Sequence, residues 1–574
     1  MNQHNQTSPL NPSSQPSNKR PDNKRPDITP SNVSRRLFGQ LAAGLGAAFY
    51  LPARSWGASQ ESSQSDNQFA RGRVFHNQDG SGKPSESNPG IPGVSVSNGK
   101  EVVLTDANGG WELPIDDQVD TLFVIKPRGW QVQMSQHNLP QSSYLHRPEG
   151  SPPLRYGGLP ATGDLPESID FGLTPQEEPD QFNALICGDP QPRDLREIDY
   201  LARTVVPHLE GTDAAFGVSL GDIMFDNLSL YDDLNQTMGL VGIPWYNVLG
   251  NHDLDFDALD NQHAYDTFKR VFGASYYAFD WGPVHFLVLN NIEWTGANPQ
   301  QGINRGSYRG FFGARQLEFI KNDLSHVPND KLVVLLMHIP LKPPGNSAAS
   351  IETGDRAELF EILKDRDKLL SFSAHLHWHA NLFYGSEDGW HGEKPFHHII
   401  TGTLCGSWFR GAPDINGIPH ATMMDGAPRG YVEVEFDSHG YKIDGYSAIG
   451  KPANFQMRIA VPQQISADKL DETTVFANIF NGCPQSTVQM KVGNGEAWLP
   501  MEQVLIQDPV YVELVQRDAN LTDPYSSLAA PAICQHLWQA KLPAEIPFGV
   551  HLIVVETTDR YGNLHRGTTT VRII

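Results

Sequence analysis

The middle of the chain, residues 181–450, alternates short apolar runs with stretches of helical periodicity. The apolar runs have the length and composition of buried strands, and the other stretches repeat apolar residues every three or four positions. The expected strands are Asn183 to Cys187, Phe216 to Leu220, Trp245 to Leu249, Leu332 to Met337 and Leu369 to Ala374; the expected helices are Asp194 to Leu209, Ala314 to Leu324 and Glu358 to Leu363; a hairpin is expected at Tyr276 to Asn290. This alternation predicts a layered α/β domain.

The segments on either side follow a β pattern. In residues 58–130, two strand-like runs within Val94 to Leu104 flank the pair Asn98-Gly99, a strong hairpin signal. With the turn Thr105-Asp-Ala-Asn-Gly109 that follows, this region resembles a transthyretin-like or carboxypeptidase-regulatory-like β-domain. Residues 131–180 are rich in Pro and Ser and are expected to be a linker or a long strap. Residues 451–574 predict a terminal β-sandwich with strands at Thr474 to Ile479 and Val550 to Val555.

Residues 1–57 differ from the rest of the chain. The first part is rich in Pro, Ser, Asn and Gln and cannot bury a core. Arg35-Arg36 then precedes an apolar run of eleven residues, Leu41 to Leu51, which is too short to span a bilayer. This arrangement resembles a twin-arginine export signal and predicts a periplasmic or secreted protein without a transmembrane segment after processing. The alternative is an arginine pair that opens a soluble helix.

Charge and cysteine content narrow the function classes. The formal net charge of −23 argues against broad binding to nucleic acid or to anionic membranes, so that a phosphate-bearing substrate must be attracted locally, by metal. The four cysteines have no metal-binding spacing. Cys187 and Cys405 are expected to be free, while Cys483 and Cys534 can pair if the compartment is oxidising.

Each of the five expected core strands is followed by a potential metal ligand. These ligands are Asp189 and Gln191, Asp222, Asn251 with its neighbour His252, His338, and finally His375 with His377. Because strand ends in an open α/β structure share one crevice, residues far apart in sequence can converge there. Carboxylates, amides and imidazoles together suit a pair of divalent transition metals about 3.5–4 Å apart, and a hydroxide held between them becomes available near neutral pH. The pattern therefore predicts a dinuclear hydrolytic site.

The order of these motifs resembles that of the calcineurin-like metallophosphoesterase family, and the outer segments resemble the N- and C-terminal extensions of a bacterial subgroup. The resemblance implies a four-layered α/β/β/α core flanked by two small β-sandwich-like domains. It places one ion on Asp189, Gln191, Asp222 and His377, and the other on Asp222, Asn251, His338 and His375, with Mn, Fe or Zn as the metals. It makes His252 the phosphate contact and leaving-group acid, supported by Asp253, and it brings Asn251 close to the substrate.

Two positions depart from the family pattern, and one loop is open to two interpretations. Gln191 replaces a His, which predicts a weaker first site or a harder ion, and Ala374 replaces a Gly. The Gly-rich stretch from Gly402 to Tyr431 is either structural or part of the substrate site, with Trp408, Arg410 and Asp414 as candidate contacts. His379 is expected near the metals without being a ligand, and His263, His285, His397 and His398 are read as ordinary histidines.

The function expected from these features is metal-dependent hydrolysis of small phosphate esters. Because metal ligands do not distinguish ester types, a phosphodiesterase or a pyrophosphatase remains open within the same class. From a different class, the alternative is a cell-surface binding protein with a vestigial metal site. An unliganded His252 beside the metals argues against the latter, since a structural site needs no proton donor.

Overall fold

The computed structural model describes residues 68–574 except positions 86, 304, 346, 494 and 496. The predicted N-terminal region, residues 1–57 with its export signal, lies outside the described residues. None of the helices in the described part combines the length and apolar character that a membrane crossing requires.

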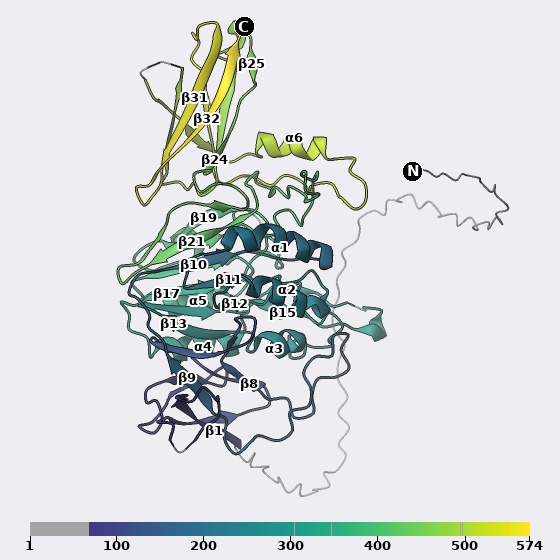
Figure 1. The fold of residues 1–574 in the computed structure, drawn as a ribbon, viewed down its shortest axis with the longest axis vertical. Coiled ribbons are helices and arrows are strands. Elements are labelled where there is room, and N and C mark those ends of the chain that lie inside the picture. Colours follow the sequence, from purple (N-terminus) through teal and green to yellow (C-terminus); the bar gives the residue numbers. More distant parts are fainter. Residues whose placement is uncertain (1–67, 86, 304, 346, 494, 496) are drawn as a thin grey trace, which may run out of the picture. The chain divides into compact units, whose positions relative to one another are not determined.

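Two six-stranded sheets form the centre of the molecule (Figure 1). The first has the order β12-β11-β10-β21-β22, with β23 paired to β21. Its strands are β10 (Phe182–Cys187), β11 (Phe216–Ser219), β12 (Trp245–Asn247), β21 (Gly430–Phe436), β22 (Tyr441–Ile443) and β23 (Ser447–Ala448). Since β10, β11 and β12 are parallel, their carboxyl ends share one edge of the sheet.

The second sheet has the order β13-β14-β17-β18-β20-β19. Its strands are β13 (Tyr277–Trp281), β14 (Val284–Val288), β17 (Leu332–Leu336), β18 (Leu369–Ser373), β19 (Ala380–Tyr384) and β20 (Phe396–Ile400). Strands β14, β17, β18 and β20 are parallel to one another. The predicted hairpin is confirmed as the antiparallel pair β13 and β14.

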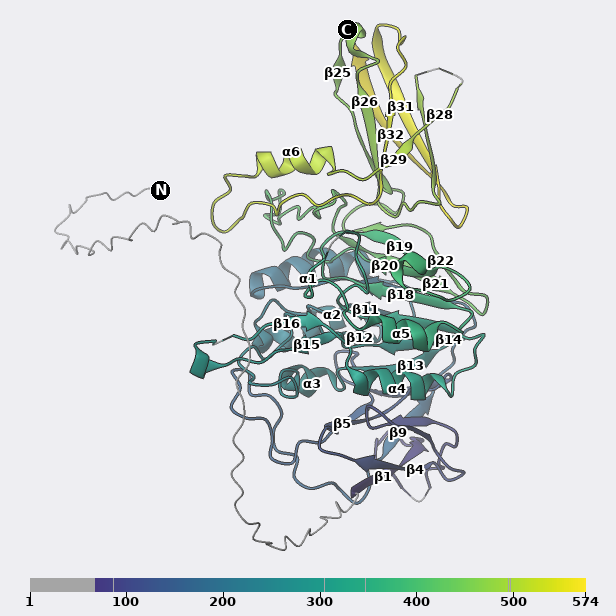
Figure 2. The ribbon, with the colours of Figure 1, turned by 180° about the vertical axis from the view of Figure 1, so that it is seen from behind.

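Helices cover the outer face of each sheet, as Figures 1 and 2 show from opposite sides. Helices α1 (Leu195–Leu209), α2 (Tyr231–Gly239) and α3 (Asp266–Phe272) share a core with the first sheet, and α4 (Ala314–Leu324) and α5 (Arg356–Leu363) with the second. Side chains such as Phe216, Phe286 and Val334 fill the space between the two sheets. The predicted four-layered α/β/β/α core is confirmed.

Helix α1 illustrates how the sequence specifies these elements. Asp194 accepts a hydrogen bond from the backbone N–H of Glu197 at 3.0 Å and caps the first turn. Ile198, Leu201, Val205 and Leu209 follow at helical spacing and are all buried against the first sheet.

The N-terminal region contains two small sheets, β4-β1-β9-β6-β7 and β3-β2-β5-β8. Their strands are β1 (Gln68–His76), β2 (Ser95–Ser97), β3 (Val102–Leu104), β4 (Gly110–Ile115), β5 (Thr121–Val124), β6 (Trp130–Met134), β7 (Pro140–Gln141), β8 (Ser143–Leu145) and β9 (Phe171–Pro175). The Asn98-Gly99 hairpin is confirmed as β2 and β3. The prediction of a linker at 131–180 is wrong, because β9 pairs with both β1 and β6 and completes the first small sheet.

The C-terminal region also contains two sheets, β24-β26-β30-β29 and β25-β32-β31-β27-β28, which share one apolar core. Their strands are β24 (Met457–Ala460), β25 (Gln464–Ile465), β26 (Thr474–Ile479), β27 (Thr487–Val492), β28 (Leu499–Pro500), β29 (Glu502–Val504), β30 (Leu537–Lys541), β31 (Gly549–Thr558) and β32 (Leu564–Ile573), with helix α6 (Pro509–Arg517) after β29. All four cysteines lie in the described part of the chain and are buried and free, so Cys483 and Cys534 do not pair.

Candidate metal centre

The predicted ligands lie on the turns that follow the parallel strands of both sheets. Asp189 follows β10, Asp222 follows β11, Asn251 follows β12, His338 follows β17, and His375 follows β18. Nine residues other than Gly have positive φ in the described part of the chain, and four of them are Gln191, Asp222, His375 and His377. Such backbones carry strain that tends to collect at functional sites. The turns are therefore shaped for their side chains.

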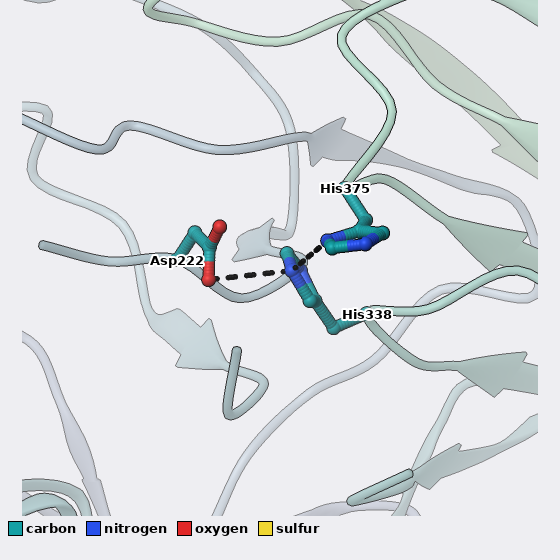
Figure 3. A group of neighbouring side chains, drawn as sticks. All are labelled: Asp222, His338 and His375. Carbon is teal, nitrogen blue, oxygen red and sulfur yellow. Dashed lines mark hydrogen bonds and ion pairs between the residues drawn. The ribbon is translucent and has the colours of Figure 1, made fainter. Parts of the chain in front are cut away.

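One group of ligands surrounds His338 (Figure 3). His338 Nε2 lies 3.3 Å from Asp222 Oδ1, 3.0 Å from Asn251 Oδ1 and 3.1 Å from His375 Nδ1. One ligand atom from each of Asp222, His338 and His375 lies within 4.8 Å of the others. These distances suit a shared cation.

The other group surrounds Asp189. Its Oδ2 atom lies 3.1 Å from His377 Nε2, and it is buried without a hydrogen-bond donor among the described residues. Gln191 Nε2 donates to Asp222 Oδ2 at 2.8 Å, while Gln191 Oε1 lies 3.9 Å from Cys405 Sγ. Asp222 thus contacts both groups through its two oxygens, as a bridging ligand must.

The ring nitrogens that face these groups are acceptors. His338 Nδ1 lies 2.7 Å from Leu220 O, His375 Nε2 lies 3.0 Å from Ser350 O, and His377 Nδ1 lies 2.6 Å from Gly406 O. Since a carbonyl only accepts, each of these nitrogens carries a proton, and the opposite nitrogen presents a lone pair whenever the ring is neutral. Lone pairs of imidazole, amide and carboxylate therefore point at one another. The residues fit divalent cations, which would satisfy them together.

The charges of the site support the same conclusion. Burial alone would raise the pKa of Asp222, but His338 and His252 hold it well below its usual value. Burial lowers the pKa of His375 to about 3, so that this ring is neutral. Burial alone would lower the pKa of His338 too, but Asp222 and Asp189 raise it to about 9. Without metal, the additional proton on His338 therefore lies on Nε2, near the same Asn251 and Asp222 oxygens that a cation would bind.

His252 lies beside this centre, but its partner is Asp226 and not Asp253. His252 Nδ1 lies 2.5 Å from Asp226 Oδ1, and Phe225 stacks on the imidazole with ring centroids 4.5 Å apart. The backbone N–H of His252 donates to Asp222 Oδ1 at 2.8 Å. The pattern of strand ends did not indicate Asp226, because this residue does not directly follow a strand. The feature of the sequence that could have indicated it is its position four residues after Asp222, at the end of the same turn.

The expectation that Asp253 supports His252 is wrong. Its carboxylate is fully buried and accepts hydrogen bonds from the backbone N–H groups of Ile223, Met224 and Gly250 and from Tyr231 Oη, at 2.9–3.1 Å. Asp253 therefore connects the turn after β11 with the turn after β12. It positions the ligands without facing the site.

Two of the three loop residues proposed as substrate contacts lie near the candidate metal ligand His377. The Trp408 ring lies 3.9 Å from the His377 ring, and the Arg410 guanidinium lies 5.1 Å from the Trp408 ring. Arg193, which the sequence did not single out, donates from Nη1 to Trp408 O at 2.9 Å and holds this loop. Asp414 is different: it is exposed, and its Oδ1 accepts from the backbone of Asn416 at 2.8 Å and of Ile418 at 2.9 Å, so it holds its own turn.

His379 lies outside both groups of ligands. It is buried, and its Nε2 lies 3.1 Å from Asn481 Oδ1 in the C-terminal region. His285, His397 and His398 are also buried, each with polar partners, whereas His263 pairs with Asp260 near the surface.

Family models match three consecutive parts of the chain. The calcineurin-like phosphoesterase model matches residues 182–379, and the models described as the N terminal and the C terminal of calcineurin-like phosphoesterase match residues 78–152 and 398–565. The chain belongs to this family. It is a metallophosphoesterase, a class of enzyme that binds divalent metal.

The solved structures that match part of this chain include two phosphatases. A dimetal phosphatase from Danio rerio is 13% identical over 46% of this chain and 96% of its own, with a TM-score of 0.33. A purple acid phosphatase from yellow lupin seeds is 13% identical over 60% of this chain and 65% of its own, also with a TM-score of 0.33. No curated protein matches the chain at a significant level.

Proposed function

We propose that this metallophosphoesterase hydrolyses small phosphate esters with two divalent cations bound side by side. Asp189, Gln191 and His377 would hold one ion, Asn251, His338 and His375 would hold the other, and Asp222 would be shared by both groups. The convergence of buried ligand atoms, with Asp189 Oδ2 left without a hydrogen-bond donor among the described residues, supports this assignment best. When bound, the ions polarise the phosphoryl group and make water nucleophilic near neutral pH.

His252 protonates the leaving oxygen in this proposal. Its Nδ1 is engaged by Asp226, so Nε2 is the ring nitrogen available to a leaving group. Burial alone would lower the pKa of His252, but Asp222 and Asp226 raise it, which favours the protonated ring. Asp226 fixes the orientation of the imidazole, and Arg305 holds Asp226 in turn at 2.9 Å.

The test compares leaving groups in a His252→Ala variant. General acid catalysis typically contributes about 10²- to 10⁴-fold, so the variant should slow by that order for an alkyl phosphate and least for a nitrophenyl phosphate, whose leaving group departs without a proton. Asp226→Asn should show the same selectivity with a smaller loss. Both variants should keep the metal content of the parent protein, measured by plasma mass spectrometry. Equal losses for both leaving groups contradict the acid role.

A panel of substrates tests which class of phosphate ester the protein hydrolyses. Trp408 offers an aromatic face beside His377, and Arg410 lies next to it, so an ester with a flat, anionic leaving group is favoured. An aryl phosphomonoester, an aryl phosphodiester and a nucleotide sugar are compared, each with Mn, Zn, Fe and no added metal. The Asp222→Asn variant tests the bridging role of Asp222 independently of substrate specificity. It should lose both ions and should lose turnover on every substrate.

We also propose that the chain is exported by the twin-arginine route, from the pattern Arg35-Arg36 before the apolar run Leu41 to Leu51. Export of a folded protein allows the metal centre to be filled before transport. Replacing both arginines with lysine should retain the precursor in the cytoplasm. Unchanged amounts of mature protein outside the inner membrane contradict the proposal.

A further inference from the structure

A cavity of about 1050 Å³ lies away from the metal centre. Its wall includes Leu332 and Leu369, the first residues of β17 and β18, whereas the metal ligands follow the last residues of the same strands. A strand of five residues extends roughly 17 Å, so the length of a strand separates the two places. The cavity is also lined by Phe383, Trp390, His397, Tyr441, Arg560 and Tyr561.

Arg560 is the cation of this wall that lies against two aromatic rings. It belongs to the turn between β31 and β32, and its guanidinium lies 4.8 Å from the ring of Phe383 and 5.2 Å from the ring of Tyr561. Its Nη1 lies 2.9 Å from His397 Nδ1. No carboxylate of the described residues lies within ion-pair distance of it. Arg560 is therefore an exposed cation at the cavity wall that has no anionic partner among the described residues.

The partner of Arg560 is a neutral acceptor. His397 is only 2% exposed, and its Nε2 lies 3.0 Å from Asn381 Oδ1, which fixes the proton on Nε2. The remaining lone pair on Nδ1 faces both Arg560 and Tyr441 Oη, the latter at 2.8 Å. Burial and the charge of Arg560 hold the pKa of His397 well below its usual value. The Tyr561 hydroxyl, also in this wall, is buried without a hydrogen-bond partner among the described residues.

The remaining charges of the wall indicate how much negative charge the cavity can hold. Lys442 pairs with Asp444, and Lys368 donates to Ser438 O at 2.9 Å, so these cations are engaged. Five carboxylates also line the cavity and disfavour a polyanion: Asp365, Asp367, Glu393, Glu435 and Asp437. The unbalanced guanidinium suits one oxyanion, since its parallel N–H groups match two oxygens of a carboxylate or a phosphonate. The aromatic walls suit an apolar, planar body.

We propose that this cavity is a second binding site, which takes a small aromatic oxyanion whose charged group lies on Arg560. The site combines parts of two regions, because Phe383 and His397 come from the second core sheet and Arg560 and Tyr561 come from the C-terminal region. A bound ligand joins those regions and stabilises the chain without entering the metal centre.

The test uses the full-length, metal-loaded protein with two probes that it cannot hydrolyse, naphthoate and phenylphosphonate. Titration calorimetry measures binding in the parent protein, in Arg560→Gln and in Arg566→Gln. Arg566 is a matched control, because it lies six positions later on β32, is largely exposed and is paired with Glu556. Hydrolysis of an aryl phosphate is measured with and without naphthoate, and the two oxyanion types show which geometry Arg560 accepts.

We expect one saturable naphthoate site per chain. The affinity for naphthoate should be at least about tenfold lower in Arg560→Gln and unchanged in Arg566→Gln. The KM for the aryl phosphate should be the same in all three proteins. Phenylphosphonate should show a second binding event, at the metal centre, that survives Arg560→Gln. The proposal is overturned if neither probe shows saturable binding at Arg560, if Arg560→Gln binds as tightly as the parent, or if naphthoate competes with the substrate.

Discussion

Gln191 shows how a single residue tunes the metal centre. In the conformation of this structure its Nε2 donates to the bridging Asp222, and its oxygen faces Cys405. Amide nitrogen is not a metal ligand, so binding of the first ion requires the amide to turn its oxygen toward Asp222. A neutral amide oxygen is also a poorer donor to Zn or Fe than imidazole. At the scale of one residue, we therefore expect the first ion to be held more weakly than the second.

Replacing Gln191 with His should therefore strengthen the first site. We expect Gln191→His to retain more metal after dialysis against a chelator and to depend less on added Mn than the parent protein. Metal stoichiometry and activity are measured across one metal titration, with Cys405→Ser as a control that changes the neighbour of Gln191 without adding a ligand. Identical titration curves for the parent and Gln191→His mean that residue 191 does not reach the ion.

At the scale of elements, Asp253 connects the turns that follow β11 and β12. Four donors share its buried carboxylate, and a buried donor without an acceptor costs about 1–3 kcal/mol. Burial and the charge of Asp222 raise the pKa of Asp253 to about 7, so the carboxylate is best tested above that pH.

The Asp253→Ala variant should lose stability and metal together. At pH near 8 we expect its free energy of unfolding to fall by about 3 kcal/mol, because several backbone N–H groups lose their acceptor. Its affinity for the ions should fall as well, since Asp222 and Asn251 are no longer held in register. Asp257→Asn, at an exposed position of the same segment, is the control. Normal metal binding in Asp253→Ala contradicts the positioning role.

A second link between elements depends on pH. His285 on β14 lies 2.8 Å from Asp280 Oδ1 and 2.8 Å from Asp323 Oδ2 of α4. Burial alone would lower the pKa of His285, but the two carboxylates raise it to about 9. Because the folded pKa exceeds the unfolded value of about 6.5, the stabilisation is complete below pH 6.5 and is lost as the pH rises through 9.

As the pH rises from about 6.5 to about 9, the melting temperature of the parent protein should therefore decrease more steeply than that of His285→Gln. We expect a difference on the order of 2 kcal/mol in the free energy of unfolding at the lower pH, and a smaller one above pH 9. Thermal unfolding at a series of pH values measures both curves. Parallel curves mean that His285 is not charged in the folded protein.

At the scale of the whole molecule, the C-terminal region is connected to the metal centre through Asp425. His536, on the approach to β30, lies 2.9 Å from Asp425 Oδ2, which also accepts from the backbone of His379 at 2.6 Å. The residue before Asp425, Met424, donates from its backbone N–H to His377 O at 3.3 Å. The extension therefore supports the segment that carries a metal ligand.

His536→Ala should thus affect both stability and the metal centre. Removing one partner of a buried ion pair typically costs about 3–5 kcal/mol, and we expect a lower melting temperature together with weaker retention of the ion on His377. His565→Ala, near the surface of the same region, serves as the control. If His536→Ala has a lower melting temperature but binds metal normally, the C-terminal region contributes to stability but does not support the metal centre.

The sequence by itself determined the alternation of core strands and helices, and with it the metal ligands. Asp189, Asp222, Asn251, His338 and His375 were identifiable because parallel strands end at one edge of a sheet, which brings their following residues together whatever their separation in sequence. Helix α1 and the hairpin of β13 and β14 were likewise predictable, since local periodicity and caps specify them.

Only the tertiary structure decided which side chains meet away from those strand ends. The partner of His252 is Asp226 because the turn after β11 bends back, and no pattern along the chain separates Asp226 from Asp253 as a partner. Strand β9 is short and isolated in a Pro-rich segment, so its pairing with β1 depends on an edge formed almost a hundred residues earlier. The cavity at Arg560 exists because two regions with separate cores meet there. Long-range contacts of this kind depend on packing, which local sequence preferences do not encode.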